Sequence, residues 1–243
     1  MELERLPDPQ AVAVRAAGIV AETVRAKPEA VLLLPAGRTP VPLYAELVRR
    51  VRAGTLDLSR AQLFQLDELL GVAPGDPRGF QSFFRKHLVQ PLGLAARFRV
   101  IDGAARDPEA EIERHRRALL SCGPADLALL GLGRNGHVAF NEPGSAPADA
   151  ARVVTLGATT VAGLAHEFVD DCPRRGLTLG LAEIGAARRI VLLVTGASKA
   201  EMLAHVLAGE PSRERPATLL ASHPGFVVLA DEEAASNVAP ARG

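Results

Sequence analysis

A histidine and a carboxylate lie five residues apart in a glycine-rich stretch: His137 and Glu142, within residues 131–145 (GLGRNGHVAFNEPGS). An imidazole exchanges protons near neutral pH, and a nearby carboxylate can orient and charge it. Glycine adopts backbone dihedrals that other residues avoid, so the stretch suits a close approach to a ligand. We interpret it as a proton-transfer site, whereas an isolated histidine in an ordinary turn is the simpler alternative.

The elements around this stretch place it at the edge of a sheet. It follows an apolar run, residues 125–130, which predicts a buried strand. Three further predicted strands, residues 30–34, 61–66 and 189–194, are also followed by polar groups. Open parallel sheets place their ligands at the carboxyl ends of their strands. We therefore expect these polar groups to converge on one site.

Two of these strand ends have the character of phosphate sites. Thr39 is a good helix cap and Pro40 suits the first helical position, which leaves backbone donors and the positive end of a helix dipole facing the loop. Ser198 can cap the next such helix, and Lys199 adds a mobile cation at its start. The alternative at each position is an ordinary capped helix with no ligand.

The third strand end carries Asp67 and Glu68 side by side. Two carboxylates that are partly desolvated and close together have raised pKa values, so one of them is suited to act as a general base near neutral pH. Solvated loop acids are the alternative. The sequence contains no nucleophile elbow, Walker loop or metal box, and we predict no metal and no cofactor.

Strand-like runs alternate with amphipathic helical segments along the chain, which predicts an α/β fold with parallel strands and a single domain over residues 1–243. Asp8 and Asp107, each followed by proline, predict two helix starts. The 28 basic and 28 acidic residues balance, which argues against nucleic acid or a membrane as partner and favours a small molecule. Two distant cysteines and a charged amino terminus indicate a cytoplasmic protein, either monomeric or homo-oligomeric.

At these residues the chain resembles the glucosamine-6-phosphate deaminase (isomerase) family, which is related to the 6-phosphogluconolactonases. The likeness is near full length and runs through residues 34–40, 66–68, 133–144, 198–200 and 222–224. Its specific part is Asn-Gly-His followed by Phe-Asn-Glu-Pro-Gly, because lactonases typically continue with Thr-Ala after this histidine. The resemblance implies a three-layer αβα, Rossmann-like fold with a mostly parallel sheet.

The resemblance also implies a reaction and its catalytic residues. The ring of an amino-sugar phosphate is opened, a proton moves from carbon 2 to carbon 1, and ammonia is expelled to leave fructose 6-phosphate. His137 would be the acid and base at the ring oxygen, oriented by Glu142, with Asn135 in the same cluster. Asp67 would shuttle the carbon-bound proton.

For the binding residues, the resemblance implies that Lys199 and Thr39, with neighbouring amides such as that of Gly37, hold the phosphate. We add Arg38 to the phosphate-binding residues and place Glu68 in the substrate site with them. The energy of binding the phosphate would position the reacting carbons, although the phosphate is remote from them.

The chain departs from the family pattern at several positions. Asn135 stands where many members carry aspartate, and Leu69 stands where deaminases usually have an aromatic residue. Near His166 the larger members place an arginine on the phosphate, and no arginine aligns there in this chain. Arg38 replaces a small residue, and we hypothesise that it is the substitute.

Three functions remain open from sequence. The first is a deaminase of amino-sugar catabolism. The second is a lactonase or another sugar-phosphate hydrolase on the same fold. The third is a non-catalytic sugar-phosphate sensor that kept the binding loops. Ammonia release from glucosamine 6-phosphate, measured beside lactone hydrolysis, separates them.

Overall fold

The computed structural model describes residues 1–239, which form two sheets. The larger sheet has seven parallel strands in the order β1-β10-β9-β6-β2-β3-β5. Its strands are β1 (Glu2–Leu6), β2 (Val31–Leu34), β3 (Gln62–Gln65), β5 (Phe98–Arg99), β6 (Leu127–Gly131), β9 (Ile190–Val194) and β10 (Phe226–Asp231). The α/β class and the mostly parallel sheet predicted from the sequence are confirmed.

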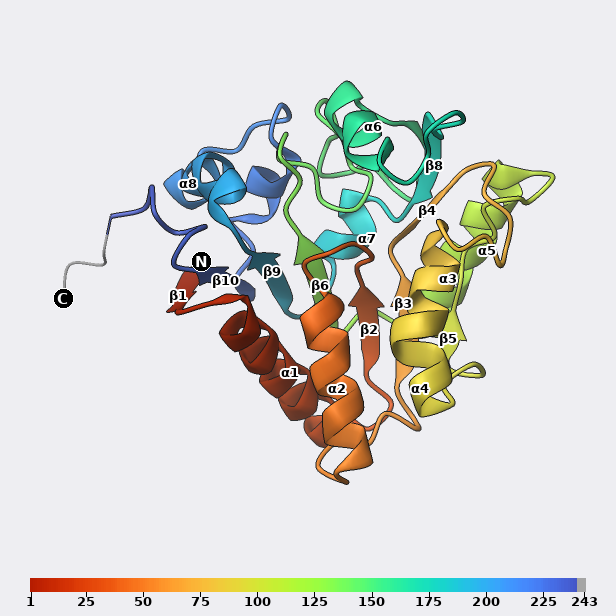
Figure 1. Cartoon of the computed structure of the whole chain (residues 1–243), viewed down its shortest axis with the longest axis horizontal. Helices are drawn as coiled ribbons and strands as arrows, with labels where there is room; N and C mark the ends of the chain where they lie inside the picture. Colours follow the sequence, from red (N-terminus) through yellow and green to blue (C-terminus); the bar gives the residue numbers. More distant parts are fainter. Residues whose placement is uncertain (240–243) are drawn as a thin grey trace.

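Helices cover both faces of the large sheet (Figure 1). The helices are α1 (Pro9–Ala26), α2 (Val41–Arg52), α3 (Phe80–Phe84), α4 (Gln90–Leu92), α5 (Pro108–Ser121), α6 (Ala158–Leu164), α7 (Leu181–Gly185) and α8 (Ala200–Ala208). One apolar core joins α1, α2, α3 and α4 to the sheet, and a second joins α5, α7 and α8 to its opposite face. The three-layer αβα arrangement is therefore confirmed.

The central strands are buried on both faces because alternate side chains enter alternate cores. Leu32 and Leu34 of β2 belong to the core shared with α1, whereas Val31 and Leu33 belong to the core shared with α5. Such strands appear in sequence as continuous apolar runs rather than as an alternation of polar and apolar residues. This is why β2, β6 and β9 could be predicted from sequence.

The two predicted helix starts at Asp-Pro are also confirmed. The Asp8 side chain accepts a hydrogen bond from the Ala11 amide (2.7 Å) at the start of α1, and Asp107 accepts one from the Ala110 amide (2.9 Å) at the start of α5. Each carboxylate satisfies a backbone donor that the first helical turn leaves free.

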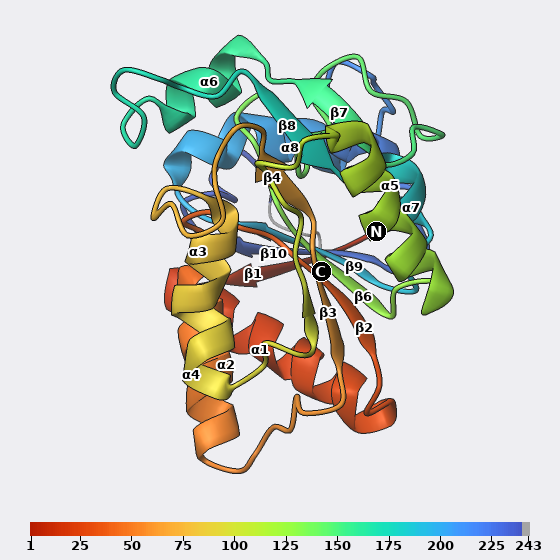
Figure 2. The same cartoon turned by 90° about the vertical axis from the view of Figure 1, so that its right-hand side faces the viewer.

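The second sheet was not predicted. It is antiparallel, in the order β4-β8-β7, and comprises β4 (Asp67–Leu69), β7 (Arg152–Thr155) and β8 (Arg175–Thr178). It lies with α6 at the end of the molecule towards which the arrow of β2 points (Figure 1, Figure 2). The predicted strand 61–66 therefore ends at Gln65, and after Leu66 the chain enters β4, so Asp67 and Glu68 lie in a strand rather than in a loop.

Neither cysteine is in a disulfide: Cys122 is exposed and Cys172 is partly buried. Within residues 1–239 no helix is long and apolar enough to cross a membrane. The single-domain organisation over residues 1–243 stays a prediction, and residues 240–243 lie outside the described residues.

Candidate active site

One cavity of about 640 Å³ opens at the carboxyl ends of the parallel strands. Six parts of the chain line it: the loop after β2, the start of β4, the start of α3, the loop after β6, α6 with the turn that follows it, and the 3₁₀ turn after β9. Asp67, His137 and Lys199 all line this cavity, as do Gly37, Arg38 and Thr39. The convergence expected from the sequence therefore occurs.

The loop after β6 is shaped around the His137 ring. A Cβ atom on Gly133 would lie 2.5 Å from three atoms of that imidazole, so only glycine leaves room for it. The Gly133 amide donates to the His137 carbonyl oxygen (2.9 Å), which closes the loop on itself. Ala139 adopts a positive φ of 49°, which is uncommon outside glycine, and it also lines the cavity. The loop is thus built for contact with a ligand.

The imidazole of His137 has two polar neighbours at the same nitrogen. Glu142 Oε2 lies 3.7 Å from His137 Nδ1, and Thr160 Oγ1 lies 3.1 Å from it. Asn135 joins the two catalytic candidates: its Nδ2 donates to Glu142 Oε2 (2.8 Å), and its Oδ1 accepts from the His137 amide (3.2 Å). Asn135 and Glu142 stand behind the imidazole and are not in the cavity lining.

The electrostatics of His137 favour the neutral ring. Burial lowers the pKa of His137 below its ordinary value, and the positive charge of Lys199 acts in the same direction, while the negative charge of Glu142 opposes both. A neutral imidazole at neutral pH has a free lone pair and can accept a proton.

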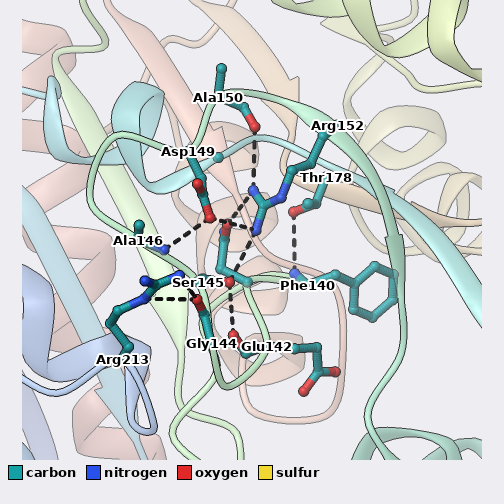
Figure 3. Close-up of polar contacts among 12 residues, drawn as sticks. Phe140, Glu142, Gly144, Ser145, Ala146, Asp149, Ala150, Arg152, Thr178 and Arg213 are labelled. Carbon is teal, nitrogen blue, oxygen red and sulfur yellow. Dashed lines mark hydrogen bonds and ion pairs between the residues drawn. The ribbon is translucent and has the colours of Figure 1, made fainter.

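A half-buried arginine supports the loop that carries Glu142 (Figure 3). Arg152 of β7 donates to Asn141 Oδ1 (3.0 Å) and to Ser145 Oγ (3.0 Å). Ser145 Oγ in turn donates to the Glu142 carbonyl oxygen (2.7 Å). The second sheet therefore fixes the loop that carries the carboxylate.

Asp67 and Glu68 are neighbours on β4 but have different environments. Asp67 is 6% exposed, and its carboxylate accepts no hydrogen bond from residues 1–239. Burial, together with the negative charge of Glu68, raises the pKa of Asp67 to about 8. A pKa this high favours the protonated carboxyl at pH 7.

Glu68 is a structural carboxylate in this fold. Its Oε1 accepts from the amides of Leu69 (2.9 Å) and Phe80 (3.0 Å), and its Oε2 accepts from Gln65 Nε2 (2.9 Å) and the Gln81 amide (2.7 Å). Four donors and no acceptor indicate the ionised form, although burial raises the pKa of Glu68. The side chain holds the start of α3 and does not line the cavity, which corrects the expectation that Glu68 contacts substrate.

The cavity lining also carries positive charge. Arg38, Arg134 and Lys199 line it, and none of the three forms an ion pair within the described part of the chain. Burial lowers the pKa of Lys199, and the nearby positive charge of Arg134 adds to this effect. Unpaired cations that face one cavity suit an anionic group.

Two of the predicted helix caps are wrong. Helix α2 begins at Val41 with Pro40 at the cap position, so the Thr39 side chain makes no capping bond. Ser198 lies inside a 3₁₀ turn, residues 197–199, and α8 begins after it with no side-chain cap. In both places the turn from strand to helix is taken up by a glycine with positive φ, Gly37 (111°) and Gly196 (86°), and this moves the helix start onward.

Several cavity residues, Arg134 among them, were not selected as site residues from the sequence. Thr160 and His166 come from α6 and the turn after it, and Phe80 comes from the start of α3. The family resemblance had already drawn attention to the region of His166, because the larger members are expected to place a phosphate-binding arginine near this position. No local sequence signal marks Thr160, because its contact with His137 depends on how α6 packs over the loop.

Comparisons with known proteins give the family. The family model described as glucosamine-6-phosphate isomerases/6-phosphogluconolactonase matches residues 7–229, and the chain belongs to this family. A Rhodopirellula baltica protein named glucosamine-6-phosphate deaminase is 39% identical over 239 residues, which cover 97% of this chain and 95% of that protein.

The solved structures agree with this assignment. A monomeric glucosamine-6-phosphate deaminase superposes with a TM-score of 0.94 at 36% identity, covering 98% of this chain and 100% of that one. A 6-phosphogluconolactonase from Leishmania guyanensis superposes with a TM-score of 0.80 at 22% identity over 98% of this chain and 99% of its own, which shows a shared fold alone.

Proposed function

We propose that the protein is a glucosamine-6-phosphate deaminase, which converts glucosamine 6-phosphate and water into fructose 6-phosphate and ammonia. One observation carries the proposal: a buried acid, an imidazole backed by a carboxylate, and unpaired cations face the same cavity. The names of the similar proteins support the same reaction. The cytoplasmic location inferred from composition belongs to this proposal.

Binding begins at the cationic residues. Lys199, Arg38 and the backbone amides of residues 37–39 hold the phosphate, and the sugar ring then lies beside Asp67 and His137, which line the same cavity. Binding energy from the phosphate, remote from the reacting carbons, orients carbons 1 and 2.

Ring opening follows at His137. The neutral imidazole takes the proton of the carbon 1 hydroxyl and gives it to the ring oxygen as the bond between carbon 1 and that oxygen breaks. Glu142 stabilises the positive charge that the imidazole carries between these two transfers, because its carboxylate lies 3.7 Å from Nδ1. Asn135 keeps the carboxylate in place.

Asp67 then moves the carbon-bound proton. As a carboxylate it takes the proton from carbon 2 and returns it to carbon 1, while a proton from the amino group passes to the carbon 1 oxygen. This leaves an imine at carbon 2, where water adds and ammonia leaves. Burial raises the pKa of Asp67 to about 8. A positively charged amino group on the substrate would favour the ionised form, so an amino sugar helps to activate its own base.

The lactonase alternative has less support. Glu142 belongs to the Phe-Asn-Glu-Pro segment that lactonases lack, and here its carboxylate adjoins the imidazole. The decisive assay follows ammonia released from glucosamine 6-phosphate in parallel with hydrolysis of 6-phosphogluconolactone. Ammonia formed in equal amount to fructose 6-phosphate supports the deaminase. Lactone hydrolysis without ammonia identifies a lactonase, and binding of the sugar phosphate without turnover identifies a sensor.

A further inference from the structure

Thr160 makes the shortest polar contact to the His137 ring. Its Oγ1 lies 3.1 Å from Nδ1, within hydrogen-bond distance, whereas Glu142 Oε2 lies 3.7 Å away, beyond it. Thr160 belongs to α6 and is 8% exposed, so this contact is partly buried. The hydroxyl of a helical threonine commonly bonds the carbonyl of the preceding turn. Within residues 1–239 the Thr160 hydroxyl bonds only the imidazole.

The Glu142 carboxylate, which adjoins this contact, has one oxygen without a hydrogen-bond partner in the described part of the chain. This oxygen, Oε1, is buried, while Oε2 accepts from Asn135 Nδ2. A buried acceptor without a hydrogen-bond partner lowers the stability of the fold, and such groups in native proteins often have a catalytic role. The charge of Glu142 acts on Nδ1 although it makes no hydrogen bond to it.

The start of α6 is fitted to this pair of groups. A Cβ atom on Gly157 would lie 2.9 Å from Glu142 Oε2, so the backbone there touches the carboxylate closely. One turn further on, Thr160 reaches the imidazole. The same segment of chain thus contacts both Glu142 and His137, although it begins well after them in the sequence.

We propose that Thr160 is a positioning residue for His137. The negative charge of Glu142 favours a proton on Nδ1, and the Thr160 hydroxyl oxygen accepts that N–H bond. This arrangement fixes the ring orientation and leaves the Nε2 lone pair free to take the proton of the carbon 1 hydroxyl. Without the hydroxyl, the ring is held only by the longer interaction with Glu142. The inference rests on the proposed function for its catalytic consequence.

Removal of the hydroxyl at constant shape tests the inference. In Thr160→Val we expect kcat to fall about tenfold with KM within about twofold of wild type, because binding is unchanged and the imidazole is misoriented. Thr160→Ser, which keeps the hydroxyl, should restore kcat to within about threefold. Thr23→Val in α1 is the matched control, since it removes a helical hydroxyl that bonds the Ile19 carbonyl far from the cavity.

A second measurement needs no substrate. Nitrogen NMR of the ligand-free protein reports the tautomer and the titration of His137, assigned by the signal that is missing in His137→Gln. We expect a dominant Nδ1–H tautomer in wild type and in Thr160→Ser, and a mixed population in Thr160→Val. If Thr160→Val does not fold, Thr160→Ala is measured by the same criteria.

The outcomes separate this inference from the proposed function. Wild-type kcat together with a wild-type His137 spectrum in Thr160→Val overturns the positioning role. A rise in KM alone also overturns it, because Thr160 would then contact substrate rather than the imidazole. If no variant releases ammonia but Thr160→Val changes the His137 tautomer, the reaction was assigned wrongly while the contact stands.

Discussion

Two groups of side chains at the cavity are built in opposite ways. In the proton-transfer group Asp67 and Glu142 are buried and His137 is partly exposed, and hydrogen bonds from surrounding elements fix the neighbours that orient them. In the cationic group Arg38 and Arg134 are exposed and Lys199 is half-buried, and no acid within residues 1–239 pairs with them. Buried groups in fixed positions suit proton transfer, whereas unpaired exposed cations suit capture of a charged ligand. The first group should therefore control kcat, and the second should control binding.

The strongest test of this division is Asp67→Asn. The amide cannot accept the proton from carbon 2, so kcat should fall by about a thousandfold or more, while the dissociation constant for the sugar phosphate changes less than about threefold. Steady-state ammonia release and isothermal titration measure the two quantities. Turnover at the wild-type rate would remove Asp67 from its assigned role.

Lys199→Ala should have the converse effect. Loss of a half-buried cation that we assign to phosphate binding should raise KM by about 10- to 100-fold, with a smaller change in kcat. Lys86→Ala provides the control, because Lys86 is exposed and lies outside the cavity. An unchanged KM in Lys199→Ala would show that the phosphate is held elsewhere.

The burial of Asp67 should also lower the stability of the folded protein by an amount that depends on pH. Asp67 ionises near its ordinary value in the unfolded chain but only near pH 8 in the folded protein, so the stability it contributes is lost as pH rises between those values. Asp67→Asn lacks this loss. Its stability relative to wild type should be greater at pH 8 than at pH 5, by about 4 kcal/mol. Urea unfolding at both pH values measures the difference, and equal differences would mean that Asp67 is ionised in the fold.

The smallest effect is expected at Arg38. An exposed arginine loses much of its interaction to solvent, so Arg38→Ala should weaken sugar-phosphate binding by about three- to fivefold. Titration with the substrate in an inactive Asp67→Asn background measures this without turnover. Unchanged affinity would exclude Arg38 as the substitute for the arginine missing near His166.

The parts of the molecule that sequence could predict are those whose signals are local. Continuous apolar runs predicted β2, β6 and β9. Asp8 and Asp107, each followed by proline, predicted the starts of α1 and α5. The strands of the second sheet are three or four residues long, and their burial arises only when β4, β7 and β8 pair. A short segment without periodicity gives no such signal.

The same distinction applies to the candidate site. His137 and Glu142 lie in one loop, so their spacing could predict their proximity, which the structure bears out. Asp67 and Glu68 are adjacent, yet only the fold shows that one side chain faces the cavity while the other bonds the start of α3. Sequence could predict that the pair is chemically suited to a site but not which of the two enters it.

The parallel pairing of β1 with β10 joins Glu2–Leu6 to Phe226–Asp231, the most distant strands of the described chain. During synthesis β1 stays unpaired until nearly all of residues 1–239 have left the ribosome, because its only neighbour in the sheet, β10, is synthesised last among the strands. A loop closed over such a span slows folding, so completion of that sheet edge should be a late event in the assembly of the molecule.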